Sequence, residues 1–298
     1  MPEALALIVI TLLGATVNGG LGYGFSSITV PLALFFYTNR LLNPSLVLLE
    51  VALNGYMLWT NRAGVSAVGR RVLPIVIGLA PGIIVGTSIV YLVSPSWIKF
   101  ATFAALIPLI LVQAAGIRRP IKSERAAGLA LGSSVGVLYS VTTISGPPLA
   151  VMFNNQGFTK HDFRAGLAIV RLAESSMTAV AYLYAGMFTV QTLGLVPLIL
   201  PSVLVGIPLG AYIIRRVRTE TFRRVCMSFD AWVVGFGMSK VLNELHLVEG
   251  PAAYSALAIV FAIDLWLYRF FVLHPPAGFQ LPEKLGDAVA ARIPNPES

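Results

Sequence analysis

The stretch Asn18-Gly19-Gly20-Leu21-Gly22-Tyr23-Gly24 lies where an apolar run over residues 4–21 ends and a shorter one, over residues 25–37, begins. A second break, Ser140-Val141-Thr142-Thr143-Ile144-Ser145-Gly146-Pro147-Pro148, precedes another short apolar run, over residues 148–153. Both runs that follow a break are too short to cross a bilayer as helices, because a span needs roughly 20 apolar residues. The two breaks therefore predict interrupted helices.

The composition places these breaks in a membrane protein. Of the 298 residues, 56% are hydrophobic and 11% are charged, whereas soluble domains carry about 25% charged residues. Three further runs, over residues 72–93, 194–214 and 251–273, are each long enough for a membrane helix. The net charge of +8 resides in short basic clusters between apolar runs, without the interleaved aromatic residues of a nucleic-acid surface. We predict an all-α polytopic membrane protein that binds lipid and no nucleic acid.

The sequence offers little for catalysis or metal binding. Cys226 is the single cysteine, and the three histidines are scattered along the chain, so neither a thiolate cluster nor a histidine cage is expected. No HExxH motif occurs. We therefore expect no enzyme, no metal site and no cofactor.

The two halves of the chain resemble each other in sequence. Pro31-Leu32-Ala33 recurs as Pro148-Leu149-Ala150, an offset of 148 − 31 = 117, and Gly82-xxx-Gly86 recurs as Gly206-xxx-Gly210, an offset of 206 − 82 = 124. The same order of breaks and glycine pairs predicts a duplication. The expected organisation is a first transmembrane repeat over residues 1–115, a cytoplasmic basic linker over 116–125, a second transmembrane repeat over 126–242, an extra transmembrane helix over 251–273 and a cytoplasmic tail over 274–298.

Basic residues in short loops predict the topology, because such loops face the cytoplasm. We expect three clusters there: Arg62, Arg70 and Arg71; Arg118, Arg119, Lys122 and Arg125; and Arg215, Arg216, Arg218, Arg223 and Arg224. The second and third clusters lie on the same side of the membrane only if the second broken segment is a pair of half-helices that enters and leaves on one face of the membrane. Arg40 then lies outside and Lys160 inside, so the repeats are inverted, as in secondary transporters. A parallel duplication with kinked, continuous helices is the alternative, and it places the third cluster outside.

The breaks are the predicted binding site. Half-helix N-termini carry a partial positive charge that suits a small anion, and we expect these residues to bind it: Gly22, Gly24, Ser26 and Ser27 from the first break, with Thr142, Thr143, Ser145 and Gly146 from the second. Alternatively, these small residues only allow helices to pack closely.

Ionisable residues within spans are the second signal, because a charge in mid-membrane is costly. Arg171 and Glu174 are three residues apart and share a helical face, so Arg171 is a predicted ligand of the anion. Glu50 lies in the corresponding span of the first half, where the offset of 117 makes Asn54 the equivalent of Arg171. Glu50 and Glu174 are the candidates for proton coupling. Arg171 and Glu174 could instead simply neutralise each other.

The glycine and proline pattern also resembles a known family. Gly14-xxxx-Gly19-Gly20-x-Gly22-x-Gly24 followed by Pro31-Leu32, repeated more loosely as Gly132-xxx-Gly136 and Ser145-Gly146-Pro147-Pro148-Leu149, resembles the sulfite exporter TauE/SafE family from about residue 12 to residue 238. The resemblance implies a multispanning permease for small sulfur-containing anions such as sulfite, thiosulfate and organosulfonates, exporting them with the proton gradient. In the second half, residues 139–144 replace what is often a more glycine-rich stretch.

Together these features predict two inverted-topology repeats with broken or re-entrant half-helices, plus one extra C-terminal span. The expected function is a secondary transporter that exports sulfite or an organosulfonate by alternating access around a mid-membrane site, coupled to protons. A passive anion channel and a transporter of a small carboxylate are the alternatives. The expected location is the bacterial inner membrane, as a monomer or homodimer.

Overall fold

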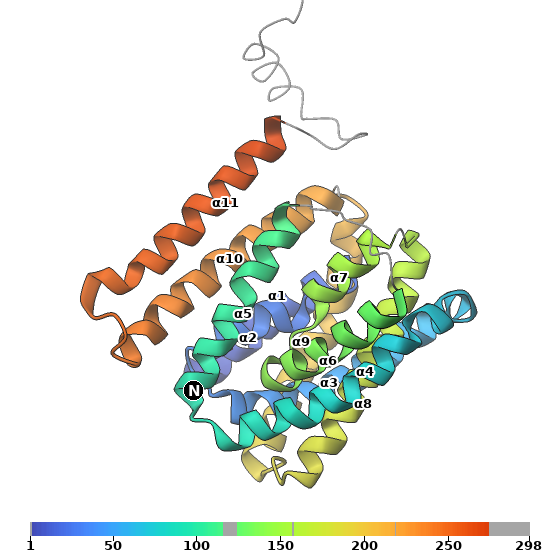
Figure 1. Cartoon of the computed structure of the whole chain (residues 1–298), viewed down its shortest axis with the longest axis horizontal. Helices are drawn as coiled ribbons and strands as arrows, with labels where there is room; N and C mark the ends of the chain where they lie inside the picture. Colours follow the sequence, from blue (N-terminus) through green and yellow to red (C-terminus); the bar gives the residue numbers. More distant parts are fainter. Residues whose placement is uncertain (1, 116–123, 157, 218, 274–298) are drawn as a thin grey trace, which may run out of the picture.

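The computed structural model describes residues 2–115, 124–156, 158–217 and 219–273 and is helical within them, without a strand. The predicted tail and most of the predicted linker lie outside the described residues. The helices, shown in Figure 1, are α1 (Pro2–Leu21), α2 (Phe25–Ala33), α3 (Asn39–Thr60), α4 (Val65–Leu92), α5 (Pro95–Ala115), α6 (Glu124–Thr142), α7 (Gly146–Asn155), α8 (Lys160–Tyr184), α9 (Val190–Ile214), α10 (Thr219–Glu244) and α11 (Ser255–Leu273), with short 3₁₀ turns at Arg62–Gly64 and Gly250–Tyr254.

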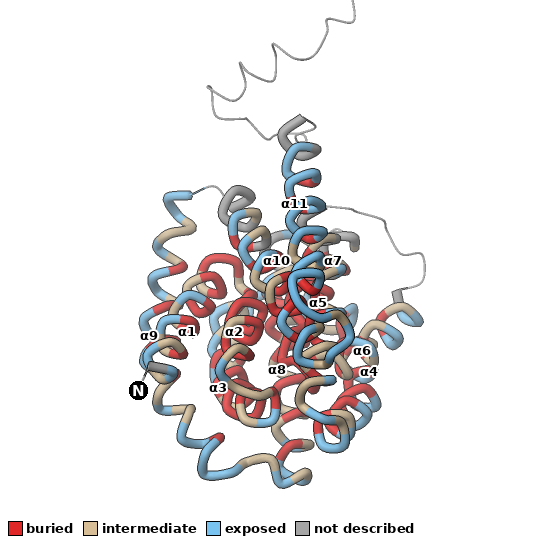
Figure 2. The backbone as a smooth tube through the Cα atoms, turned by 90° about the vertical axis from the view of Figure 1, so that its left-hand side faces the viewer, coloured by how far each residue is buried: buried red, intermediate tan, exposed pale blue. Residues whose placement is uncertain are grey.

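The protein is a multi-pass membrane protein. Six of the described helices are long and apolar enough to cross a bilayer, at Glu3–Leu21, Asn39–Thr60, Arg62–Leu92, Val190–Ile214, Arg224–Glu244 and Gly250–Arg269. Buried residues gather in the centre of the bundle, whereas α11 is exposed along most of its length (Figure 2). Its exposed side chains include Phe261, Leu265 and Trp266, an apolar surface that suits lipid.

Both predicted interruptions are present. The helix α1 ends at Leu21 and α2 begins at Phe25, while α6 ends at Thr142 and α7 begins at Gly146. In the first break, Gly22 and Gly24 have φ angles of 83° and 110°, which glycine adopts without steric cost. In the second break the left-handed position is held by Thr143, with φ of 57°, a conformation that is costly for a β-branched residue. The two breaks therefore turn the chain in similar ways with different residues.

The helix boundaries correct the predicted repeat register. The ends of α1 and α6 differ by 142 − 21 = 121, the starts of α2 and α7 by 146 − 25 = 121, and the starts of α3 and α8 by 160 − 39 = 121. The offset of 117 taken from the recurring Pro-Leu-Ala motif is wrong by four residues, about one helical turn. The position equivalent to Arg171 is therefore Glu50, not Asn54.

Glycines allow two pairs of helices to pack with their backbones in contact. The helix α4 packs along α6, and α9 packs along α1. A Cβ atom at Gly82 of α4 would lie 2.1 Å from the carbonyl oxygen of Ser133, and one at Gly210 of α9 would lie 1.8 Å from that of Thr16. The recurring Gly-xxx-Gly motifs thus have equivalent roles, each holding a long helix against the helix that leads into a break.

Two contacts identify the helix ends that share one end of the bundle. Arg40, at the start of α3, donates to the carbonyl oxygen of Val90 near the end of α4 over 2.9 Å. Ser45 of α3 donates to the carbonyl oxygen of Thr192, near the start of α9, over 2.6 Å. We call this end of the bundle the Arg40 end.

The opposite end, which we call the basic end, carries the described members of the three basic clusters. The start of α4 brings Arg62, Arg70 and Arg71, the start of α6 brings Arg125, and the end of α9 brings Arg215 and Arg216. Gly128 of α6 packs against Pro74 of α4, which places the starts of these two helices together. These described basic residues therefore share one side of the bundle, as expected if this side faces the cytoplasm.

We predict that Gly210→Ala destabilises the protein by about 1–3 kcal/mol, because the added methyl group would overlap the backbone of α1. Gly194 is a matched control, since it lies in the same helix and a Cβ atom there meets nothing within 4 Å. Thermal unfolding of the detergent-solubilised variants measures the difference. Equal melting temperatures for Gly210→Ala and Gly194→Ala would contradict the packing described above.

Candidate functional site

Three charged side chains meet in the interior of the bundle. Glu50 of α3 and Glu174 of α8 are fully buried, and Arg171 of α8 is 3% exposed. The Arg171 Nη2 atom lies 3.1 Å from Glu50 Oε1, and its Nε atom lies 3.9 Å from Glu174 Oε1. The prediction that Arg171 and Glu174 share a helical face is confirmed, and the structure adds Glu50 across the helix interface. We call Glu50, Arg171 and Glu174, together with Asn18 of α1, whose side-chain oxygen accepts a hydrogen bond from Arg171, the charge cluster.

Glu50 is the better satisfied of the two carboxylates. Its Oε1 atom accepts hydrogen bonds from the Ser26 hydroxyl of α2 and from the guanidinium of Arg171. Its Oε2 atom accepts a hydrogen bond of 2.6 Å from the Tyr139 hydroxyl of α6. Three donors from three other helices thus stabilise a buried negative charge on Glu50.

Glu174 has fewer partners. Its Oε1 atom accepts a hydrogen bond from the Ser145 hydroxyl in the second break, and Arg171 is farther from it than from Glu50. Its Oε2 atom is buried and has no hydrogen-bond partner within the described part of the chain. A buried carboxylate oxygen without a donor is costly when ionised, so a negative charge is less well stabilised on Glu174 than on Glu50.

Arg171 is held from several sides. Besides Glu50, its guanidinium donates to the side-chain oxygen of Asn18 in α1 over 3.3 Å. Asn54 of α3 donates to the backbone carbonyl oxygen of Arg171 over 3.2 Å. With both carboxylates ionised the cluster carries a charge of −1, so the positive charge of Arg171 is neutralised by its two carboxylate neighbours.

The predicted site residues fall into two groups. Ser26 and Ser145 lie at equivalent places after the two breaks, and each donates to one carboxylate of the charge cluster. The hydroxyls of Ser27, Thr142 and Thr143 donate to backbone carbonyl oxygens of their own segments. In this arrangement the second group shapes the breaks and does not contact the charges.

The two breaks also touch each other. A Cβ atom at Gly146 would lie 3.1 Å from the ring of Tyr23, between Gly22 and Gly24 of the first break. The absence of a side chain at Gly146 therefore lets the start of α7 approach the first break. Although 121 residues separate equivalent points of the breaks, the fold brings them together.

Asn18 and Tyr139 belong to the site but were not predicted from the sequence. They are equivalent in the corrected register, since 139 − 18 = 121, and each contacts the charge cluster from the helix that leads into a break. The offset of 117 concealed this relation. A register taken from the breaks themselves, rather than from the Pro-Leu-Ala motif, would have revealed it.

The chain belongs to the sulfite exporter TauE/SafE family, whose model matches residues 7–237. No curated protein and no solved structure matched the chain. The matched region contains both breaks and the whole charge cluster. Membership implies a membrane transporter of the sulfite-exporter type, in agreement with a small anionic substrate and with the resemblance inferred from the glycine and proline pattern.

We predict that Thr143→Gly leaves the stability unchanged or raises it by up to about 1 kcal/mol, because a left-handed conformation costs about 1–2 kcal/mol for a residue with a Cβ atom. Thr142→Gly is the matched comparison. It should destabilise the protein, because the Thr142 hydroxyl accepts a hydrogen bond of 3.0 Å from the backbone N–H of Ile144. Melting temperatures of the purified variants test this order, and a lower value for Thr143→Gly than for Thr142→Gly would refute it.

Proposed function

From the family and the charge cluster we propose that the protein is a secondary transporter that exports a small sulfur-containing oxyanion, such as sulfite or an organosulfonate, from a bacterial cell. We propose that the anion binds in mid-membrane between the two breaks and moves by alternating access, coupled to protons. The observation that carries the mechanism is the buried guanidinium of Arg171, which is held by Glu50 at the junction of the interrupted helices.

The helix contacts support inverted repeats. The helix α4 packs on α6 and α9 on α1, α5 packs on α7 and α10 on α2, and α3 packs on α8. A twofold axis through the contact of α3 with α8 would map the α4–α6 contact onto the α9–α1 contact. It would likewise map the α5–α7 contact onto the α10–α2 contact. The helix α4 starts at the basic end and its equivalent α9 starts at the Arg40 end, as inverted repeats require.

The proposed binding step is an exchange of partners on Arg171. An oxyanion that reaches the charge cluster accepts hydrogen bonds from the guanidinium in place of the Glu50 carboxylate. The hydroxyls of Ser26 and Ser145 lie beside the carboxylates and supply further donors once those carboxylates release them. The N-termini of α2 and α7, which follow the breaks, add partial positive charge. Gly22, Gly24, Ser27, Thr142, Thr143 and Gly146 shape the backbone that approaches the anion.

Proton coupling follows from the charge balance. An anion added to a cluster of charge −1 would bring the buried charge to −2, which is costly in a membrane interior. Binding of one proton to a carboxylate offsets the added charge. We propose Glu174 as the proton carrier, because before the anion binds Glu50 accepts hydrogen bonds from three donors, whereas Glu174 accepts one from a hydroxyl group and lies farther from the Arg171 guanidinium. Glu50 then acts as the counter-ion that takes Arg171 back after the anion leaves.

The first test of this proposal is ligand stabilisation. We expect sulfite, thiosulfate or an organosulfonate to raise the melting temperature of the purified protein, and Arg171→Lys to abolish that rise, because lysine lacks the planar fork that binds oxyanions in two places. Lys240→Gln is the control, since Lys240 contacts the rings of Phe35 and Phe236 and not the cluster. If only carboxylates stabilise the protein, the substrate is a small carboxylate and not a sulfur oxyanion.

The second test separates coupling from binding. In proteoliposomes, Glu174→Gln should still exchange labelled sulfite across the membrane but should no longer accumulate it in response to an imposed pH gradient. Asp230→Asn is the matched control, because Asp230 is also a buried carboxylate and its oxygens have no hydrogen-bond partner among the described residues. If Glu174→Gln accumulates sulfite at the wild-type level, Glu174 is not the coupling residue. If the sulfite flux of the wild-type protein does not depend on the pH gradient, the protein is a channel.

A further inference from the structure

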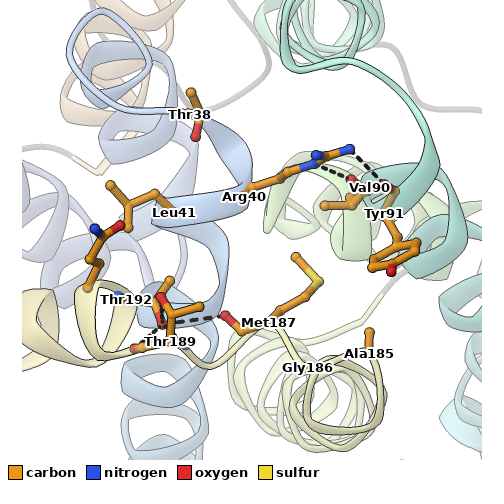
Figure 3. A pocket seen from close by; sticks show the side chains of 11 residues that line it. Thr38, Arg40, Leu41, Val90, Tyr91, Ala185, Gly186, Met187, Thr189 and Thr192 are labelled. Carbon is orange, nitrogen blue, oxygen red and sulfur yellow. Dashed lines mark hydrogen bonds between the residues drawn. The ribbon is translucent and has the colours of Figure 1, made fainter.

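A cavity of about 650 Å³ opens at the Arg40 end of the bundle. The start of α3, the end of α4 and the turn between α8 and α9 line it, as Figure 3 shows. Arg40 supplies the charge among its lining residues, and the polar side chains of Thr38, Thr189, Gln191 and Thr192 supply hydrogen-bonding groups. The cavity therefore offers hydrogen-bonding groups and the positive charge of Arg40, whose guanidinium donates to the carbonyl oxygens of Val90, Tyr91 and Val93 at the end of α4.

A thin apolar layer separates this cavity from the charge cluster. It consists of Val47, Tyr139 and Tyr182, all fully buried, which form a small cluster apart from the main core. We call these three residues the tyrosine layer. Met187 lines the cavity and also packs against this layer, so one side chain connects the two.

Two helices each contribute residues to the cavity, to the tyrosine layer and to the charge cluster, and these residues follow one another in the same spatial order on both helices. Along α3, Leu41 lines the cavity, Val47 belongs to the layer and Glu50 belongs to the cluster. Along α8 and the turn after it, Ala185 lines the cavity, Tyr182 belongs to the layer, and Glu174 lies two turns before it in the cluster. The layer thus lies between the cavity and the cluster on two independent elements.

Hydrogen bonds connect the layer to the cluster and to the second break. The Tyr139 hydroxyl donates to Glu50 Oε2 over 2.6 Å. The Tyr182 hydroxyl donates to the backbone carbonyl oxygen of Ser140, just before the second break. A change in the charge or position of Glu50 therefore acts directly on one ring of the layer.

The basic end is closed in a different manner. A cavity there, lined by residues that include Arg71, Phe153 and Phe158, measures about 10 Å³. The rings of Phe153 and Phe158 stack with centroids 4.8 Å apart, and the guanidinium of Arg71 lies 4.3 Å from the centroid of Phe158. The cavity at the Arg40 end is therefore much larger than this cavity at the basic end.

We infer that the cavity at the Arg40 end is the vestibule through which the anion passes to or from the charge cluster, and that the tyrosine layer is the barrier across this path. The inference rests on the proposed function and extends it with a route and a gate. When the anion takes Arg171 from Glu50, the hydrogen bond from Tyr139 loses its fixed acceptor and the layer loosens. The vestibule then connects with the site.

Cysteine accessibility tests the barrier without a transport assay. In a Cys226→Ser background, Thr178→Cys places a thiol on α8 one turn after Glu174 and one turn before Tyr182, at a fully buried hydroxyl without a hydrogen-bond partner in the described region. The probe is a membrane-impermeant methanethiosulfonate reagent that carries a sulfonate group. It is added to the membrane face from which a thiol at Gln191→Cys, in the vestibule, reacts.

We expect Thr178→Cys to react slowly with the reagent when the tyrosine layer is intact. The reaction should be about tenfold faster or more in Tyr182→Ala, because the reagent can then reach the thiol without displacement of the Tyr182 ring. Val47→Ala, on the facing helix, should act in the same direction. Ile98→Ala is the matched control, since Ile98 is equally buried in the neighbouring apolar cluster with Val90 and Val141. Thermal unfolding shows whether each variant is folded, and the Gln191→Cys reaction, at an exposed position, shows that the reagent reaches the vestibule.

Each outcome decides between the claims. If Tyr182→Ala and Val47→Ala leave the rate at Thr178→Cys unchanged, or if Ile98→Ala raises it equally, the barrier is not where we place it. If the rates behave as expected but sulfite neither stabilises the protein nor raises the rate of reaction at Thr178→Cys, the tyrosine layer is still the barrier and the proposed substrate is wrong. Tyr139→Phe, which keeps the ring but removes the bond to Glu50, should raise the rate less than Tyr182→Ala does.

Discussion

The ion pair between Arg171 and Glu50 is the interaction on which the rest of the site depends. A single charge at the centre of a membrane helix costs about 2.5–3.5 kcal/mol even on the mildest scales, and removing one partner of a buried pair costs about 3–5 kcal/mol. The pair persists because other helices contribute donors and an acceptor around it, among them Ser26, Tyr139 and Asn18. Interrupted helices make this possible, since each break lets a serine hydroxyl approach a carboxylate.

The corrected register gives this pair a simple origin. Glu50 and Arg171 occupy equivalent positions of the two halves, as do Asn54 and Ser175, which lie 3.5 Å apart as a hydrogen-bonded pair. Residues that contact their own equivalents lie close to the axis relating the repeats. Opposite charges at one such position attract each other, whereas a strictly symmetric duplication would place two like charges together. The opposite charges of Glu50 and Arg171 therefore stabilise the contact of α3 with α8, and in the proposed mechanism Arg171 also supplies the cation that binds the anion.

Much of this architecture follows from the sequence, and the failures have identifiable causes. Hydropathy and the glycine, serine and threonine stretches located both interruptions, because short apolar runs cannot span a bilayer. The register was wrong because a short Pro-Leu-Ala match carries no information on where a helix begins. The hydroxyls of Ser27, Thr142 and Thr143 donate to backbone carbonyl oxygens, and their role in binding the anion stays a prediction. Composition predicts that a break is polar, but only the backbone path decides which hydroxyls point inward.

The tyrosine layer shows how charge and access are joined in one structure. Tyr139 has two roles, because its ring belongs to the apolar layer and its hydroxyl binds Glu50. An apolar barrier alone would respond to no ligand, and a charge cluster alone would not block a path. A ring whose position depends on the state of Glu50 links the two, so that the barrier is most secure when Arg171 is paired with Glu50 and no anion is bound. Differential stability of the barrier between the empty and occupied states is what alternating access requires.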